Sequence, residues 1–160
     1  MNEQRDSAGV WFPPPLIYVI GLLAAFTLSR IFPPVNVPDV IGAPMVVYAY
    51  FVLFLALGVL MLLWAFGTFK RAGTAILPIS PTSQVVESGP YQLTRNPMYV
   101  AMSFIYLGLG ALVSWGYSIL LLPVVLIVIY LYVIRREERY LTAKFGQEYL
   151  EYKERVRRWI

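Results

Sequence analysis

Residues 96–134 read NPMYVAMSFIYLGLGALVSWGYSILLLPVVLIVIYLYVI, and these 39 residues contain no charged side chain. A single straight helix of this length would be about 58 Å long, nearly twice the roughly 30 Å thickness of the hydrocarbon core of a bilayer. The Ser-Trp-Gly sequence at residues 114–116 is the natural point for the chain to turn back. The run therefore predicts a hairpin of two membrane-spanning helices, at about residues 98–113 and 117–134.

The rest of the chain has the same apolar character. Of its 160 residues, 59% are hydrophobic and only 14% are charged, and the mean hydropathy is +0.65. A soluble domain is about half apolar and a quarter charged. Two more apolar segments, at about residues 16–32 and 45–66, are long enough to cross a bilayer. Pro33, Pro34 and Pro38 require an irregular connection between them. These features predict an all-α integral membrane protein with about four transmembrane helices.

After the last predicted span, residues 135–160 are charged and carry an apolar stripe. Its members recur at steps of three and four: Leu141, Phe145, Tyr149, Tyr152, Val156 and Trp159. This spacing is typical of one face of a helix. It predicts a C-terminal amphipathic helix that lies on the membrane surface and is interrupted at Gly146.

Lysine and arginine residues gather on one side of the predicted bundle. With four spans, twelve of the thirteen lie in the two tails and the central loop, and only Arg30 lies on the opposite side. Because basic residues concentrate in cytoplasmic segments, both termini are predicted to be cytoplasmic. We expect a cytoplasmic tail at residues 1–15, the first two helices at 16–66 and a core at 67–160. The net charge of +4 reports this topology and does not indicate a nucleic-acid partner.

The chain contains neither cysteine nor histidine. Disulfides and thiolate metal sites are therefore excluded. The commonest metal ligand and the commonest general base are also missing, so no metal site is expected.

Four segments hold the residues that could carry chemistry, and each has a structural interpretation as well. The block GPYQLTRNPMY at residues 89–99 is rich in turn signals, and its Asn-Pro pair could simply cap the next helix. The charges at 135–139 could form a solvated anchor or could turn one carboxylate inward. The Gly-Leu-Gly sequence at 108–110 permits close approach of a helix or of a ligand. The basic residues within 69–74 are typical of a cytoplasmic anchor.

Taken in order, these segments resemble the isoprenylcysteine carboxyl methyltransferase and phospholipid methyltransferase superfamily. The resemblance covers about residues 65–160 and depends mainly on the Arg-Asn-Pro-x-Tyr block and the downstream Glu-Glu pair. The matching motifs are Phe69-x-Arg71-Ala72-Gly73-Thr74, Gly89-Pro90-Tyr91, Arg95-Asn96-Pro97-x-Tyr99, Gly108-x-Gly110, Glu137-Glu138 and Phe145-Gly146-x-Glu148-Tyr149-x-x-Tyr152.

Members of this superfamily transfer a methyl group from S-adenosylmethionine to a lipid-like acceptor, and they hold the cofactor under the tail helix. The resemblance therefore implies that residues 67–160 form a cofactor-binding core. The implied contacts come from the block before the third span, from two glycines and from the acidic pair: Tyr91, Arg95, Asn96, Pro97, Tyr99, Gly108, Gly110, Glu137 and Glu138. Arg95 and Glu138 are expected to matter most for catalysis, Arg95 as a bidentate donor to the cofactor carboxylate and Glu138 as an acceptor for ribose hydroxyls. The face of a tyrosine suits the sulfonium.

The acceptor is less constrained. Many relatives have histidine where this chain has Asn96, so no strong base for neutral pH is evident. A carboxylate, with a pKa of about 3.5, needs no base, whereas a lipid amine, nearer 10, must first lose a proton, and a thiol, near 8.5, is intermediate. We therefore expect carboxyl O-methylation of an isoprenylcysteine-type acceptor, or of another prenylated or lipid-like molecule. This acceptor is expected to lie among the membrane lipids. Phospholipid N-methylation and thiol S-methylation stay open, with Glu137 or Glu138 as the base.

An interpretation of another class also stays open. Each motif taken alone fits a non-catalytic membrane module, in which the charged segments are anchors and the tail helix binds a partner.

Overall fold

The computed structural model describes residues 9–33, 35, 43–73 and 82–159, and this part of the chain is helical or irregular, without strands. Three long helices form the bundle: α1 (Pro14–Ile31), α3 (Pro44–Ala72) and α4 (Pro97–Val128). The shorter elements are a 3₁₀ helix η1 (Gly89–Gln92), a π-helical segment η2 (Ile129–Ile134), α5 (Arg135–Phe145) and α6 (Gln147–Arg155). The prediction of an all-α integral membrane protein is confirmed.

Proline and glycine residues set the limits of these helices. Pro14, Pro44 and Pro97 stand in the first turn of the three long helices, where their missing N–H group leaves no hydrogen bond unmade. Gly73 ends α3 in the left-handed conformation, with φ of 66°. Gly146, with φ of 55°, separates α5 from α6 at the interruption that the sequence predicted.

The chain turns back within α4 at Ser114. The φ and ψ angles of Ser114 are −171° and 91°, which are not helical. Gly110 and Ser118, eight positions apart, would be about 12 Å apart in a straight helix. Here a Cβ atom on Gly110 would lie only 2.5 Å from Cβ of Ser118. The break therefore forms a hairpin within the Ser-Trp-Gly segment that was expected to turn.

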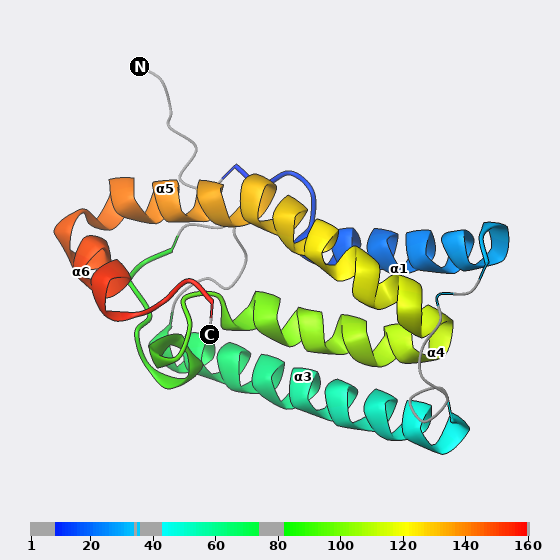
Figure 1. Ribbon diagram of the computed structural model, residues 1–160. Helices are drawn as coiled ribbons and strands as arrows, with labels where there is room; N and C mark the ends of the chain where they lie inside the picture. The colour runs from blue at the N-terminus through cyan, green and yellow to red at the C-terminus, as the bar shows by residue number, and fades with distance from the viewer. Residues whose placement is uncertain (1–8, 34, 36–42, 74–81, 160) are drawn as a thin grey trace.

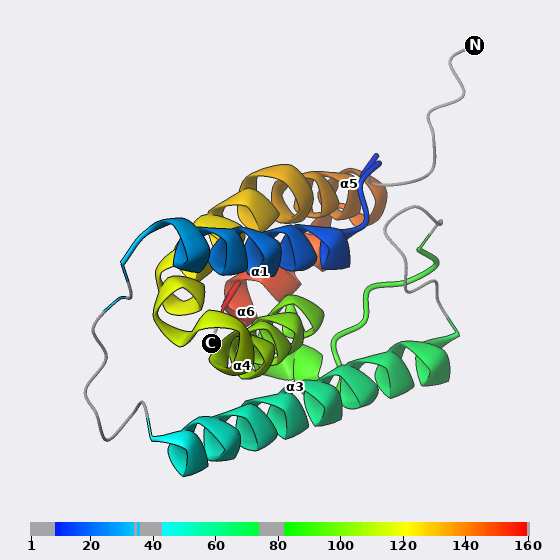
Figure 2. The same cartoon turned by 90° about the vertical axis from the view of Figure 1, so that its right-hand side faces the viewer.

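The first arm of this hairpin lies between the other two long helices (Figures 1 and 2). On one side, Gly58 of α3 packs so closely on α4 that a Cβ atom would lie 2.7 Å from the carbonyl oxygen of Ala101. On the other side, α1 meets both arms and η2 in a buried apolar cluster. Its buried members are Val10, Ile17, Tyr18, Tyr99, Tyr106, Val125, Ile129, Val133 and Ile134.

Three continuous helical stretches are long and apolar enough to cross a membrane: Pro14–Ile31, Pro44–Ala72 and Pro97–Phe145. The last contains 49 residues, and the break at Ser114 divides it into the two arms of the hairpin. The first helix has nearly the predicted limits, while α3 continues to Ala72 and so extends beyond the predicted end at residue 66. Large apolar side chains on the outer face of α3, such as Leu60 and Leu63, are exposed, as expected of a surface that meets lipid.

Some sequence-based expectations fall outside the described residues. They concern Arg5 and the tail before residue 9, the prolines at positions 34 and 38, and Thr74 of the Phe-Lys-Arg motif.

Candidate active site

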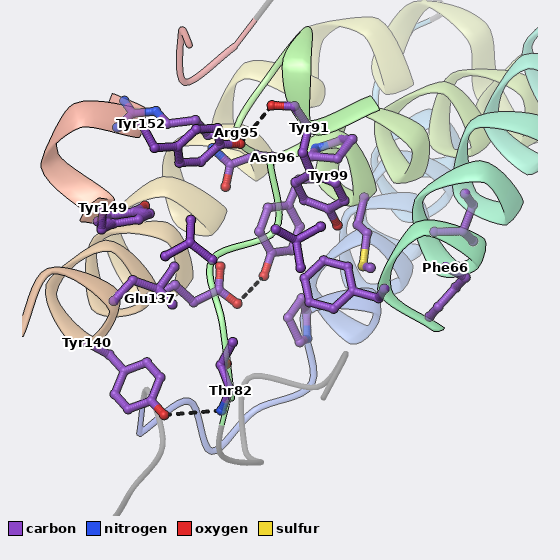
Figure 3. Close-up of a pocket in the computed structure, with 18 of the residues that line it drawn as sticks. Phe66, Thr82, Tyr91, Arg95, Asn96, Tyr99, Glu137, Tyr140, Tyr149 and Tyr152 are labelled. Carbon is purple, nitrogen blue, oxygen red and sulfur yellow. Dashed lines mark hydrogen bonds between the residues drawn. The ribbon is translucent and has the colours of Figure 1, made fainter. Parts of the chain in front are cut away.

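A cavity of about 250 Å³ lies at the end of the bundle where α3 ends and α4 begins (Figure 3). The block at residues 89–99 forms one wall, α5 and α6 form a second, and the ends of α1 and α3 close the apolar side. The lining residues are Pro14, Pro15, Leu62, Phe66, Phe69, Thr82, Gln84, Val85, Val86, Tyr91, Arg95, Asn96, Pro97, Met98, Tyr99, Met102, Glu137, Tyr140, Leu141, Tyr149 and Tyr152. Polar and charged groups therefore face an apolar wall across one cavity.

The first wall is held against α3 by a close contact at Gly89. Its φ is 61°, and a Cβ atom there would lie 2.6 Å from Oγ1 of Thr68, so a larger residue would not fit. Tyr91 is buried in the η1 turn that follows. Its ring packs edge-on against the ring of Phe69, with 5.1 Å between the ring centroids. The hydroxyl of Tyr152 donates a 2.8 Å hydrogen bond to the carbonyl of Tyr91 and so joins α6 to this wall.

The chain returns to the same wall after α6, in a segment that we call the C-terminal strap, residues 156–159. The backbone N–H of Arg95 donates to the carbonyl of Arg157 at 2.9 Å. The carbonyl of Arg158 accepts 2.9 Å hydrogen bonds from the Thr94 hydroxyl and from Nδ2 of Asn96. Asn96 does precede α4, but its side chain binds the C-terminal strap and makes no cap hydrogen bond to the helix. The C-terminal strap thus fixes the backbone on both sides of Arg95.

Arg95 and Glu138 belong to a cluster of three charges. Arg158 grips both carboxylate oxygens of Glu138, with Nε–Oε1 and Nη2–Oε2 distances of 2.9 and 2.8 Å. Nη2 of Arg95 lies farther away, 3.4 Å from Oε1. Nε and Nη1 of Arg95 are buried and have no hydrogen-bond partner among the described residues. A buried guanidinium with free donors is costly unless a ligand supplies the acceptor, so Arg95 is suited to bind an anionic group.

The second carboxylate, Glu137, points into the cavity instead (Figure 3). Successive residues of a helix point about 100° apart, so Glu137 and Glu138 cannot face the same side. Glu137 accepts a 2.8 Å hydrogen bond from the hydroxyl of Tyr99. The carbonyl of Tyr99 in turn accepts from the hydroxyl of Tyr18 on α1 at 3.0 Å. The carboxylate at the cavity wall is therefore held by a residue of α4 that is itself bonded to α1.

Tyrosine residues supply much of the remaining wall. Tyr149 and Tyr152 of α6 are buried, with only 3% of each exposed. Burial raises the pKa of both hydroxyls well above their usual range, and it does the same for Tyr91. All three stay neutral at physiological pH and present aromatic faces, which suit a cationic ligand.

The structure brings together six of the nine residues expected at a cofactor site. Tyr91, Arg95, Asn96, Pro97, Tyr99 and Glu137 line the cavity. Glu138 does not line it, because Arg158 holds both of its oxygens.

The two glycines lie elsewhere. A Cβ atom on Gly108 would meet the backbone of Phe51 and Leu55 in α3, and one on Gly110 would meet Ser118. These glycines permit close helix packing, and neither lines the cavity.

Arg158 is the main residue that the sequence analysis missed. It was counted only as one of many basic residues in the tail, and its partner Glu138 lies 20 positions earlier. Tyr149 and Tyr152 were recognised as members of the apolar stripe but not as cavity walls. Within the described residues, no group of three or more His, Cys, Asp or Glu side chains could hold a metal ion.

The fold and the site define a class of protein: a helical membrane bundle with a cavity at one end, which apolar groups and a few polar groups line. The sequence model of the phospholipid methyltransferase family matches residues 35–148, which is more than half of the chain. The chain belongs to the phospholipid methyltransferase family.

Two curated proteins are similar over shorter stretches. The cobalt-zinc-cadmium resistance protein CzcN of Cupriavidus metallidurans is 39% identical over 72 residues, which are 45% of this chain and 33% of that protein. An uncharacterized protein of Haemophilus influenzae is 40% identical over 67 residues, which are 39% of this chain and the whole of that protein. The chain thus spans about a third of the length of CzcN. No solved structure matches the chain.

Proposed function

We propose that this protein is a membrane methyltransferase that uses S-adenosylmethionine and an amphiphilic acceptor. Family membership supports the reaction class. One observation of the site carries the proposal: the buried Arg95, with two donors free, lines the polar side of a cavity whose other side is apolar. A zwitterionic cofactor fits the polar side, and the chain of a lipid fits the apolar side.

Three groups of this cofactor have candidate partners among the described residues. Arg95 would bind its carboxylate through one of its free donors, Nε or Nη1. Glu137 has carboxylate oxygens that can accept hydrogen bonds from hydroxyl groups. The neutral rings of Tyr149 and Tyr91 would face the cationic centre. When bound, the cofactor supplies an activated methyl group on a sulfonium.

The protein's own contribution would be alignment and the exclusion of water. Methyl transfer requires the donor and the acceptor to be held in line, which can account for a large part of a rate enhancement. Leu62, Phe66 and Met102 form an apolar wall that would orient a lipid chain and keep water out. This wall belongs to α3 and α4, which are both apolar enough to lie in a bilayer.

The first candidate acceptor is a carboxylate, as in an isoprenylcysteine-type substrate. It needs no general base, which agrees with the absence of histidine from the chain. The second candidate is a phospholipid amine, and one observation favours it: Glu137 places a carboxylate at the cavity wall. This carboxylate would attract an ammonium group and accept its proton, whereas it would repel a second carboxylate.

The remaining class, a membrane module that binds a partner through its tail, has weaker support. The apolar stripe of the tail, which was expected to bind a partner, packs against other residues of the same chain. Tyr149 and Tyr152 are buried with Ala65, Val86 and Tyr91 in one apolar cluster. We further propose that both termini and the cavity face the cytoplasm, because twelve of thirteen basic residues would then lie on that side.

A transfer assay tests the proposed function. Purified protein in detergent would be given methyl-labelled S-adenosylmethionine and three amphiphiles of equal chain length, with a carboxylate, an amine or a thiol as the head group. We expect label in one of the three lipids, and none with the Arg95→Ala variant. If folded wild-type protein labels no amphiphile and binds no cofactor, the proposal is wrong.

A further inference from the structure

Arg158 lies outside the stretch that matches the family model, which ends at residue 148. It is nevertheless the residue that controls how Glu138 is paired. Its guanidinium makes a two-pronged contact with both oxygens of that carboxylate, at 2.9 and 2.8 Å. It also lies over the ring of Tyr130, with its Cζ atom 5.0 Å from the ring centre. Arg158 is therefore fixed in place by contacts on two sides.

This arrangement decides which donors of Arg95 are available. Glu138 is close to both guanidinium groups, but Arg158 occupies both of its oxygens. Arg95 has only the longer 3.4 Å approach, and its Nε and Nη1 donors have no partner among the described residues. Without Arg158, the oxygens of Glu138 would be released to form the same two-pronged contact with Arg95. Nε, one of the two donors left for a ligand, would then be occupied by the protein itself.

The net charge of the cluster also depends on Arg158. Arg95, Glu138 and Arg158 together carry one net positive charge, so the cluster attracts an anionic group. Loss of Arg158 would leave a neutral pair of Arg95 and Glu138. The cluster would lose one of its free donors and its net charge.

From this geometry we propose that Arg158 is a positioning residue: it holds Glu138 away from Arg95 and so keeps Arg95 free to bind the carboxylate of the cofactor. This inference depends on the proposed function, because it assumes a ligand with a carboxylate. It extends the site beyond residues 89–99 to the C-terminal strap.

The experiment compares two probes on full-length protein in detergent. S-adenosylhomocysteine has the amino-acid carboxylate, whereas 5′-methylthioadenosine shares the nucleoside and lacks the carboxylate. We expect Arg158→Gln to weaken binding of S-adenosylhomocysteine about tenfold or more and to leave binding of 5′-methylthioadenosine within about twofold. Arg155→Gln is the matched control, since Arg155 forms an exposed ion pair with Glu87 at 2.7 Å on the same tail.

A double variant separates positioning from a merely structural role. In Glu138→Gln with Arg158→Gln, no carboxylate competes for Arg95 and the net charge of the cluster is again one positive. We expect this double variant to regain most of the affinity for S-adenosylhomocysteine that Arg158→Gln loses. A structural role predicts that the double variant binds no better than the single one. Circular dichroism and thermal unfolding show whether each variant is folded. If Arg158→Gln is not folded, Arg158→Lys takes its place, because lysine keeps the positive charge but cannot make the two-pronged contact.

Four outcomes would overturn the inference. Wild-type affinity in Arg158→Gln would mean that Arg158 does not control Arg95. An equal loss for both probes, or failure of the double variant to recover, would mean that Arg158 only supports the fold. If wild-type protein binds neither probe, the proposed function itself fails, and this inference fails with it.

Discussion

Replacement of Arg95 by methionine should separate binding from stability. Methionine has a similar length and no charge. The variant loses only the 3.4 Å contact with Glu138, and that carboxylate keeps its two shorter contacts with Arg158. It also removes two buried donors that have no partner, each of which costs about 1–3 kcal/mol in the absence of a ligand. We therefore expect the thermal unfolding midpoint to stay unchanged or to rise.

Binding should respond in the opposite direction. A hydrogen bond from one of these guanidinium donors to a carboxylate contributes about 1.5–3 kcal/mol. Since each 1.4 kcal/mol is a factor of ten, Arg95→Met should weaken binding of S-adenosylhomocysteine at least about tenfold. Calorimetric titration measures the affinity, and circular dichroism on heating measures the midpoint. Arg155→Met, on the exposed part of the tail, should change neither.

The reasoning would be refuted by the reverse pattern. If Arg95→Met binds the ligand as wild type does, but its midpoint falls by more than about 5 °C, Arg95 serves the fold and not a ligand. About 1 kcal/mol corresponds to about 2–4 °C in a chain of this size, so such a fall would show a lost interaction.

Three further outcomes are expected. Gly58→Ala should destabilise the bundle by about 1–3 kcal/mol, because its Cβ atom would lie 2.7 Å from a backbone carbonyl oxygen. The control Gly67→Ala should be neutral or stabilising, because no neighbouring atom would lie closer than 3.7 Å to its Cβ atom. Thermal unfolding of both variants measures the difference, and equal effects would contradict the close packing at Gly58. Because the chain has no native cysteine, single cysteines at positions 153 and 45 can report the membrane topology. A membrane-impermeant maleimide added to intact cells should label Met45→Cys and not Lys153→Cys. Labelling of Lys153→Cys would show that the orientation is the opposite one. Glu137→Gln keeps an oxygen that can accept a hydrogen bond from a cofactor hydroxyl but is not a base, so it should abolish transfer to an amine acceptor and largely retain transfer to a carboxylate acceptor. Unchanged amine transfer would exclude Glu137 as the base.

The fold was largely predictable because its causes are local. Long uncharged runs predicted the helices, and prolines at residues 14, 44 and 97 mark their starts. The turn within residues 114–116 followed from simple length, because a run of 39 residues is too long for one span.

The site was only partly predictable because its contacts join distant parts of the chain. Glu137 and Glu138 point about 100° apart on α5, and only the packing of this helix shows that Glu137 is the one that faces the cavity. The pairing of Glu138 with Arg158 depends on the reversal at Gly146, which brings the C-terminal strap back to the block before α4. The pattern of small residues at 108–110 is the same for a helix contact and for a ligand contact, and only the packing against α3 and Ser118 distinguishes the two.

The most direct test of the account is a calorimetric titration of the folded wild-type protein, in mild detergent, with S-adenosylmethionine and with S-adenosylhomocysteine. The account predicts saturable binding of both, at about one molecule per chain. Absence of binding by protein that is demonstrably folded would contradict it, and would favour a membrane module in which the cavity has lost its cofactor.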